Sequence, residues 1–579
     1  MPNMIQNAKD SISQILNAAY QKAAEKGELP AGAALSGTVE IPKDSANGDF
    51  AANHAMAGAK ALHMAPRKIA ETLIANADLA DTWFASVEVA GPGFINFRLA
   101  DRWYADVLQA VTREGADYGR SDIGHGQKVM VEFVSANPTG PMHMGNARGG
   151  VLGDALASVL DRAGYQVWRE VYVNDAGNQI EKFANSIDAR YQQLLLGEEQ
   201  VAFPEDGYHG DDIKDLAKLF YEANGDKYLT VPVAERHQAM AEFGLQRNIP
   251  KMQEDLRRYG IEYDQWFFES ELHESGYVAE SVQKLTDRGY TYEKDGALWL
   301  KTSQILAEQL LKAGKKQEEI DKLELKDDVL RRANGFYTYF AADIAYHRNK
   351  LEKRGFDKAI NVWGADHHGH VARLKGAMDA LGLDGEHRLD IVLMQLVKLT
   401  RNGEVVRMSK RTGKAISLTD LLDEIPVDAA RYFFNSRPES PVEFDLELAI
   451  RQDSENPVYY VQYAHARICT LLSALAAEGH TVPASADAAL LSTPEEKELI
   501  KQLAALPEEI RLAARDYDPS RINRYVTELA ARFHRFYTVC RIKGAESDVQ
   551  AARLLLADCV RRVIAVSLGI IGVTAPEKM

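Results

Sequence analysis

The chain has 579 residues, of which 46% are hydrophobic and 26% charged, and its formal net charge is −16 at pH 7. This length exceeds that of one domain and predicts roughly three or four domains. The acidic balance argues against a protein that coats nucleic acid indiscriminately, but it leaves room for a shaped RNA partner held by local basic faces. No apolar run is long enough to span a membrane and no secretory signal is evident. The three cysteines have no metal-binding spacing, so we expect reduced thiols in a cytoplasmic protein.

Residues 1–120 are predicted to form a small α+β domain. Residues 7–26 are amphipathic and indicate a helix. The segment 91–97 predicts a turn that leads into a strand. Phe94 in this segment is most simply a core residue, whereas an exposed ring beside Asn96 would offer a platform on which a nucleobase stacks.

The next stretch, residues 129–165, predicts a strand, a loop and a helix in succession. An apolar, β-branched run is followed by turn residues and then by helical periodicity. Between the loop and the helix lies the tetrapeptide His143-Met144-Gly145-Asn146. A helix N-terminus presents free N–H groups, a glycine admits close approach, and a histidine adds a donor. The stretch is therefore either a nucleotide-phosphate site or an ordinary strand–helix turn.

Residues 121–385 are predicted to form a Rossmann-type α/β domain. A second strand follows the first helix at residues 167–173, and a strand–helix–strand unit of this length implies right-handed parallel pairing. Residues 183–300 are mostly helical and charged, so we expect an insertion there. Farther along, Tyr339 and Asp343 have the spacing that puts two side chains on one helix face.

Polar residues follow the predicted strand at residues 359–363. Gly364, Asp366 and His367 come directly after it, with two more histidines close by. A metal site is one interpretation, but no distant fourth ligand is indicated. Because the carboxyl edge of a parallel sheet binds ligands for other reasons, we expect no metal here.

Residues 386–455 are predicted to connect this domain to the next. A strand–turn–strand around Asn402-Gly403 leads into a basic loop that contains Met408, Ser409 and Lys410. An exposed charged loop is the simplest interpretation. The alternative is a mobile clamp, because such a loop can deliver cations to a developing pyrophosphate.

Residues 456–579 predict an α-helical domain with a different charge balance. They include 15 Lys and Arg against 14 Asp and Glu, so the net negative charge of the chain lies upstream. Several arginines and Tyr537 accompany the apolar face of the helix predicted after Asp518. This combination favours RNA binding, and a solvated charged face is the alternative.

Two motifs together resemble the HIGH and KMSKS signatures of class I aminoacyl-tRNA synthetases, namely His143-Met144-Gly145-Asn146 and Met408-Ser409-Lys410. Further segments, which cover nearly the whole chain, are similar to arginyl-tRNA synthetases: residues 132–138, residues 174–179, Tyr339 with Asp343, residues 460–467 and Asp428-Ala429-Ala430-Arg431. The resemblance implies a multidomain α/β plus all-α fold. Its parts would be a Rossmann-type catalytic domain with an insertion, a small N-terminal α+β domain and a C-terminal helical bundle.

The resemblance also implies roles for individual residues. The residues implied to be catalytic are His143, Asn146 and Lys410. Those implied to bind ATP are His143, Gly145, Asn146, Gly364, Asp366, Met408, Ser409 and Lys410. Those implied to bind arginine are Glu132, Asn137, Tyr339, Asp343 and His367. Those implied to bind tRNA are Phe94, Asn96, Tyr460, Tyr463, Tyr537 and Met579. Chemistry agrees for arginine, since a guanidinium is a planar five-donor cation that carboxylates read well.

The implied activity is the ligation of L-arginine to tRNA(Arg). Arginine would react with ATP, accompanied by Mg²⁺, to give arginyl-adenylate and pyrophosphate, and would then pass to the terminal adenosine of the tRNA. A monomer that binds neither DNA nor membrane is implied as well. Three residues depart from the signatures, because Asn146 replaces a histidine, Arg407 a lysine and Arg411 a serine. The alternatives are another class I synthetase or nucleotidyltransferase, and a non-enzymatic paralogue that only binds RNA.

Overall fold

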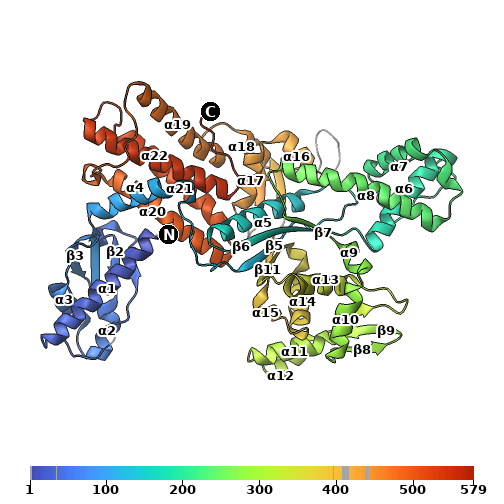
Figure 1. Ribbon diagram of the computed structural model, residues 1–579, viewed down its shortest axis with the longest axis horizontal. Helices are drawn as coiled ribbons and strands as arrows, with labels where there is room; N and C mark the ends of the chain where they lie inside the picture. The colour runs from blue at the N-terminus through green and yellow to red at the C-terminus, as the bar shows by residue number, and fades with distance from the viewer. Residues whose placement is uncertain (1–2, 34, 396, 407–415, 437–441) are drawn as a thin grey trace.

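The computed structural model describes residues 3–33, 35–395, 397–406, 416–436 and 442–579, except for the side chains of Asp366 and Val442. The predicted clamp residues Arg407, Met408, Ser409 and Lys410 therefore lie outside the described residues. Figure 1 shows a central parallel sheet with the N-terminal domain and the C-terminal helices on its left and a helical arm on its right.

The central sheet has five parallel strands in the order β12-β11-β5-β6-β7. They are β5 (Lys128–Glu132), β6 (Gln166–Val173), β7 (Gln265–Phe268), β11 (Lys358–Gly364) and β12 (Leu389–Met394). The middle of β5 is fully apolar and buried, as a parallel strand covered on both faces requires. Helix α5 (Met144–Arg162) connects β5 to β6, so the predicted strand–helix–strand unit is confirmed.

The helical arm is built from α6 (Asn178–Leu196), α7 (Asp211–Asn224) and α8 (Val233–Arg258), which share an apolar core of their own. An insertion was expected over residues 183–300. The structure differs, because β7 lies within this range and pairs with β6 as a strand of the central sheet. A strand of four residues is too short to stand out among helical segments. A separate antiparallel sheet follows, made of β8 (Thr291–Lys294), β9 (Ala297–Leu300) and β10 (Asp328–Arg331).

Seven α-helices of the described residues lie in the chain between β7 and β12. They are α9 (Glu269–Glu274), α10 (Tyr277–Asp287), α11 (Thr302–Lys312), α12 (Gln317–Ile320), α13 (Tyr339–Arg348), α14 (His368–Ala380) and α15 (Gly385–Arg388). Helix α13 begins where Thr338 Oγ1 accepts a hydrogen bond from the Ala341 N–H at 3.4 Å. It continues into a π-helical turn, Asn349–Lys353, which buries Lys350 completely. Such turns are rare and often lie at functional sites.

The N-terminal domain packs α1 (Met4–Glu25), α2 (His54–Leu62) and α3 (Pro66–Asn76) with a four-stranded sheet, whereas α4 (Asp101–Glu114) packs against helices of the C-terminal part. Its strands, in the order β1-β2-β4-β3, are β1 (Val39–Glu40), β2 (Phe50–Ala52), β4 (Phe94–Leu99) and β3 (Phe84–Ala90). Phe94 begins β4 and is 38% exposed, so its interpretation as a core residue is wrong. Asn96 is 3% exposed, so its side chain is buried in the domain and does not reach the surface.

The C-terminal part is helical, as predicted. Its helices are α16 (Leu418–Glu424), α17 (Val427–Asn435), α18 (Leu446–Ile450), α19 (Pro457–Ala477), α20 (Pro494–Asp516), α21 (Ser520–Val539) and α22 (Ser547–Ile570). Upstream, β13 (Val397–Arg401) pairs with β14 (Glu404–Val405) across Asn402-Gly403 and with β15 (Val442–Asp445). Both turn residues have positive φ, which confirms the predicted hairpin. No helix in the described part of the chain is long and apolar enough to cross a membrane.

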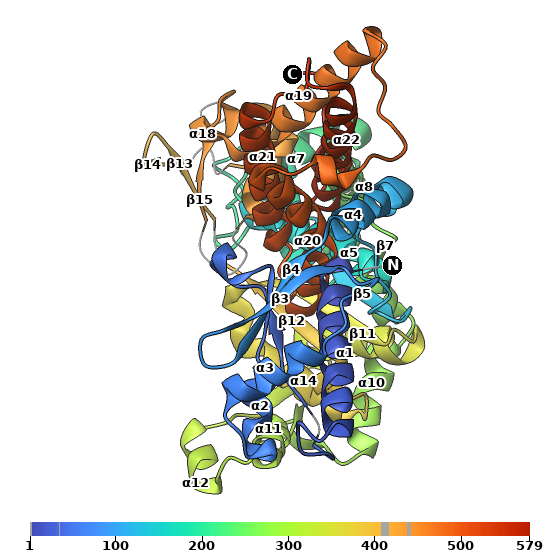
Figure 2. The same cartoon turned by 90° about the vertical axis from the view of Figure 1, so that its left-hand side faces the viewer.

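One buried side chain joins the C-terminal helices to the catalytic domain. Arg431 on α17 forms an ion pair with Asp154 on α5 and donates to the carbonyl oxygens of Tyr259 at 3.0 Å and Ile571 at 3.2 Å. These partners belong to α5, to the end of α8 and to the end of α22. Figure 2 shows the resulting arrangement, with the C-terminal helices above the N-terminal domain.

We expect Arg431→Ala to lower the free energy of unfolding by about 3–5 kcal/mol, because it leaves several buried carbonyl groups unpaired and removes one of the two arginines that pair with Asp154. Denaturant titration measures this change. The matched control is Arg67→Ala, which removes an ion pair whose arginine side chain is 60% exposed. It should change the free energy of unfolding little. Equal midpoints for the two variants would contradict the structural role of Arg431.

Candidate active site

A cavity of about 650 Å³ opens at the carboxyl ends of β5, β6 and β11, where parallel sheets commonly bind ligands. All five residues predicted to bind arginine line it, namely Glu132, Asn137, Tyr339, Asp343 and His367. Four of the residues predicted to bind ATP line it as well, namely His143, Gly145, Asn146 and Gly364. The fold thus brings side chains from distant parts of the sequence into one cavity.

The tetrapeptide with the phosphate-site pattern forms the start of α5. His143 is the N-terminal cap residue, and its N–H donates to Asn146 Oδ1 at 3.1 Å. Asn146 thus uses its oxygen to satisfy one free backbone donor, and its amide nitrogen keeps two donors of its own. Desolvation by the surrounding protein lowers the pKa of His143, which favours a neutral ring, although part of that ring stays accessible.

The segment that follows the predicted clamp lies beside this helix start. Ser417 forms a backbone bridge with His143, and the Leu418 N–H donates to the Met142 carbonyl oxygen at 2.8 Å. Ser417 also caps α16 through Asp420. The chain that the structure describes from Ile416 onward is therefore attached directly to the histidine of the first motif.

Glu132, at the end of β5, already has a cationic partner. Its carboxylate pairs with the ammonium of Lys350 and accepts a hydrogen bond from Ser135. Lys350 is fully buried and also donates to Asn361 Oδ1 at 3.0 Å. Burial lowers the pKa of Lys350, and its attraction to Glu132 opposes that shift. Lys350 could not be predicted from the sequence, because lysines are usually exposed.

Asp343 is oriented by a second chain of contacts. His370 Nε2 lies 3.0 Å from Asp343 Oδ2, and Arg373 donates to His370 Nδ1 at 3.2 Å. Because Nδ1 accepts, Nε2 carries the hydrogen that binds Asp343. Beneath them, His347 is fully buried with its pKa held well below the usual range by desolvation. The cavity floor is therefore polar and hydrogen-bonded.

Glu269 is a further carboxylate in the cavity. It begins α9 directly after β7 and is 3% exposed. His273 Nε2 lies 3.4 Å from Glu269 Oε1. Glu269 could not be predicted from the sequence. It reaches the edge of the central sheet only because β7, which follows the helical arm in the chain, pairs with β6.

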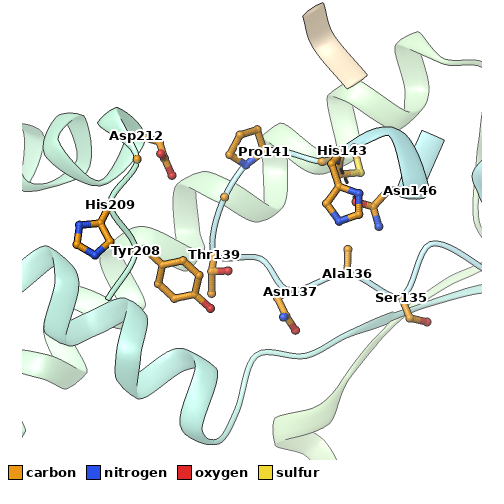
Figure 3. A pocket seen from close by; sticks show the side chains of 13 residues that line it. Ser135, Ala136, Asn137, Thr139, Pro141, His143, Asn146, Tyr208, His209 and Asp212 are labelled. Carbon is orange, nitrogen blue, oxygen red and sulfur yellow. Dashed lines mark hydrogen bonds between the residues drawn. The ribbon is translucent and has the colours of Figure 1, made fainter. Parts of the chain in front are cut away.

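A second hollow of about 450 Å³ adjoins the first on the side of the helical arm. Figure 3 shows His143 and Asn146 on one side of it and Tyr208, His209 and Asp212 on the other. The residues from the arm precede or begin α7 and have no recognisable motif in the sequence. The arm thus contributes directly to the surroundings of the predicted phosphate site.

The comparison with known families agrees with this geometry over the whole chain. Residues 6–99 match the arginyl tRNA synthetase N terminal domain, residues 107–442 the class I (R) tRNA synthetase catalytic domain, and residues 461–579 the DALR anticodon binding domain. The arginine–tRNA ligases of Acetivibrio thermocellus and Caldanaerobacter subterraneus are 52% and 54% identical to it, and each match covers 100% of both chains.

This chain belongs to the arginyl-tRNA synthetase family. Its fold is also that of the Thermus thermophilus arginyl-tRNA synthetase, with a TM-score of 0.72, 21% identity and coverage of 99% of this chain and 100% of the other. The expected class I fold, with its α/β core and C-terminal helices, is thereby confirmed.

The C-terminal helices of this synthetase present an aromatic cluster around Tyr463, which is 40% exposed. Its ring stacks on Tyr459 with centroids 6.1 Å apart, and His534 lies between Tyr463 and Tyr460. Arg467 lies 4.3 Å from the ring centroid of Tyr537. The chain end is held nearby, because His465 Nδ1 lies 2.8 Å from the Pro576 carbonyl oxygen, and Met579 is exposed.

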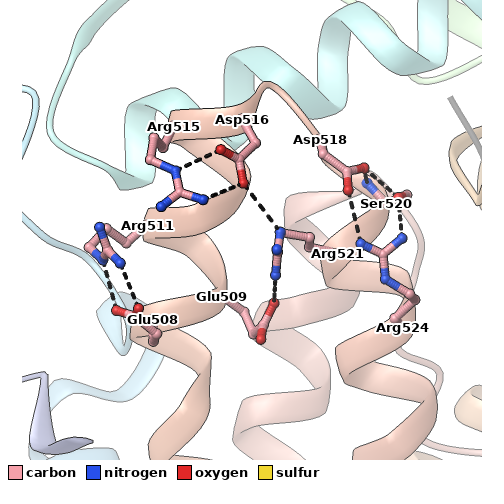
Figure 4. Close-up of polar contacts among 9 residues, drawn as sticks. All are labelled: Glu508, Glu509, Arg511, Arg515, Asp516, Asp518, Ser520, Arg521 and Arg524. Atoms are coloured by element: carbon pink, nitrogen blue, oxygen red, sulfur yellow. Dashed lines mark hydrogen bonds and ion pairs between the residues drawn. The ribbon is translucent and has the colours of Figure 1, made fainter. Parts of the chain in front are cut away.

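Most of the arginines predicted beside this cluster have acidic partners. Figure 4 shows Arg521 with Glu509 and Arg524 with Asp518, where α20 meets α21. These pairs favour the alternative of a solvated charged face at this junction. The aromatic cluster, not the junction, retains the features of a base-binding surface.

We expect Lys350→Met to destabilise this synthetase by about 3–5 kcal/mol, because Glu132 would remain buried without a counter-charge. Denaturant titration measures the loss. Combining Lys350→Met with Glu132→Gln should recover part of it, since no unpaired charge then remains. Lys358→Met, which removes a partly exposed ion pair with Asp390, is the control. A double variant no more stable than the Lys350 variant would contradict the proposed pairing.

Proposed function

We propose that this synthetase charges tRNA with arginine in two steps within the 650 Å³ cavity. The arginine carboxylate attacks the α-phosphorus of ATP, which forms arginyl-adenylate and releases pyrophosphate. The 2′-hydroxyl of the terminal tRNA ribose then attacks the adenylate carbonyl, which forms the ester and releases AMP. Positioning and charge stabilisation provide most of this catalysis.

The charge of the cavity is the observation that supports arginine as the substrate. Three carboxylates line it, Glu132, Asp343 and Glu269, and one lysine compensates only one of them. The cavity therefore keeps an excess of negative charge, which matches a cationic substrate such as arginine. We assign the guanidinium to Glu132, Asp343 and Tyr339, and the α-amino and carboxyl groups to Asn137 and His367. A site of this kind rejects neutral analogues without editing.

The start of α5 supports the ATP assignment. His143, Gly145 and Asn146 would hold the phosphates, and Gly364 would leave room for the adenosine. Lys410, Met408 and Ser409 would complete the clamp, and Asp366 would lie near the adenosine. Because Ser417 adjoins His143, a loop that ends there can reach the pyrophosphate. Mg²⁺ would enter as the counter-ion of ATP, and we assign no side chain to it.

Two surfaces would hold the tRNA outside the catalytic cavity. Phe94 is exposed on the N-terminal domain and would stack on a base, with Asn96 supporting its strand from below. Tyr460, Tyr463, Tyr537 and the chain end at Met579 would form the anticodon side. We further propose a monomer in the cytoplasm, which fits three cysteines without disulfides.

Aminoacylation of total tRNA with each amino acid in turn tests this function. Arginine alone should give charged tRNA. Charging with a different amino acid would favour another class I specificity, and no charging at all would favour an RNA-binding paralogue. The presence of His143 and of all the cavity carboxylates argues against the latter.

We expect Asp343→Asn to raise the KM for arginine about 10- to 100-fold and to leave the KM for ATP unchanged, since it removes a charged hydrogen-bond partner of the guanidinium. Steady-state aminoacylation measures both values. Asp379→Asn on α14 is the matched control, because Asp379 contacts Gln309 outside the cavity. An equal rise of both KM values would contradict the guanidinium assignment.

A further inference from the structure

A third hollow, of about 440 Å³, lies directly beside the catalytic cavity. Tyr339 and Glu269 line both spaces, so these two side chains form a shared wall. The other walls come from the start of α6 and from the loop between β10 and α13. Apart from Tyr339 and Glu269, none of the residues that line this hollow has a role in the function proposed above.

The loop at its rim presents an unusual aromatic side chain. Phe336 is 69% exposed, the highest value for a large hydrophobic side chain among the described residues. The loop that carries it is closed by its own hydrogen bonds. The Arg332 N–H donates to the Phe336 carbonyl oxygen at 2.9 Å, and the Phe336 N–H donates to Asn334 Oδ1 at 3.2 Å. The closed loop thus holds the Phe336 ring at the rim of the hollow, where a planar ligand inside it could stack on the ring.

The remaining lining indicates which ligand fits. Glu181 and Glu269 bring two carboxylates, against the single guanidinium of Arg332. Two carboxylates disfavour a phosphate. They favour a nucleobase with an exocyclic amine, because a carboxylate accepts a hydrogen bond from the amine of cytosine. Aromatic rings and arginine planes stack on unpaired bases, and Phe336 and Arg332 supply both.

We propose that this hollow binds the unpaired base next to the terminal adenosine of the tRNA. That base is cytosine in the common C-C-A end of tRNA. Phe336 stacks on its face, Glu181 accepts from its exocyclic amine, and Tyr339 separates it from the reacting adenosine. The inference rests on the proposed charging reaction, because it follows the tRNA outward from the catalytic cavity.

Phe336→Ala tests the stacking. We expect about tenfold weaker binding of intact tRNA and a similar fall in kcat/KM for tRNA, with unchanged KM values for arginine and ATP. Phe336→Trp should retain most of the activity, since it keeps a stacking surface. Leu311→Ala removes another exposed apolar side chain, on α11, and should behave as the unchanged protein does.

A shortened tRNA locates the contact. With tRNA that lacks its last two nucleotides, Phe336→Ala and the unchanged protein should bind equally well, because the stacking partner is gone. A loss of the same size with shortened tRNA, or normal charging by Phe336→Ala, would overturn the proposal. Failure of the unchanged protein to charge tRNA with arginine would instead refute the proposed function.

Glu181→Ala tests how the base is read. With ordinary tRNA we expect a several-fold loss of kcat/KM. When the penultimate cytosine is replaced by uridine, which lacks the amine, the unchanged protein should lose activity and Glu181→Ala should add no further loss. An equal effect of Glu181→Ala on both tRNAs would show that Glu181 does not contact this base.

Discussion

The arrangement of the molecule depends on the buried guanidinium of Arg431. It binds Asp154 on α5 and carbonyl oxygens at the ends of α8 and α22, so one cation joins the catalytic helix, the arm and the C-terminal helices. A buried charge that loses such partners is costly, and the meeting of the three segments is therefore favoured. Gly572 leaves the space that the guanidinium fills, since a Cβ there would lie 1.9 Å from Arg431 Nη2.

Helix α5 transmits this constraint to the active site. Its glycines leave room for the residue that follows β5, since a Cβ on Gly153 would come within 2.2 Å of the Phe133 ring. The helix start, with His143 and Asn146, is consequently fixed relative to the carboxyl end of β5 and to Glu132. Asn146 retains the capping function in place of a histidine, because its oxygen accepts from the His143 backbone.

Local patterns were sufficient to predict β5, α5, β6 and the hairpin at Asn402-Gly403, since periodicity and turn chemistry are encoded over a few residues. The resemblance then indicated a set of residues that the fold gathers around one cavity. Three residues of the site could not be predicted from local patterns. Lys350 is placed by a π-helical turn, Glu269 by the pairing of the short strand β7 with β6, and Tyr208 by a loop of the helical arm. Phe94 was misjudged for a related reason: composition favours burial of phenylalanine, and only the turn before β4 places it outside.

The pairing of Glu132 with Lys350 bears on how three carboxylates can face one cavity. Like charges held close together repel one another, and the repulsion is strongest where water is excluded. The buried ammonium of Lys350 offsets part of this repulsion, and it does so without lining the cavity that the substrate would fill. The carboxylates can therefore be fixed in place by the fold before a cationic substrate arrives, and the buried lysine acts as a positioning residue.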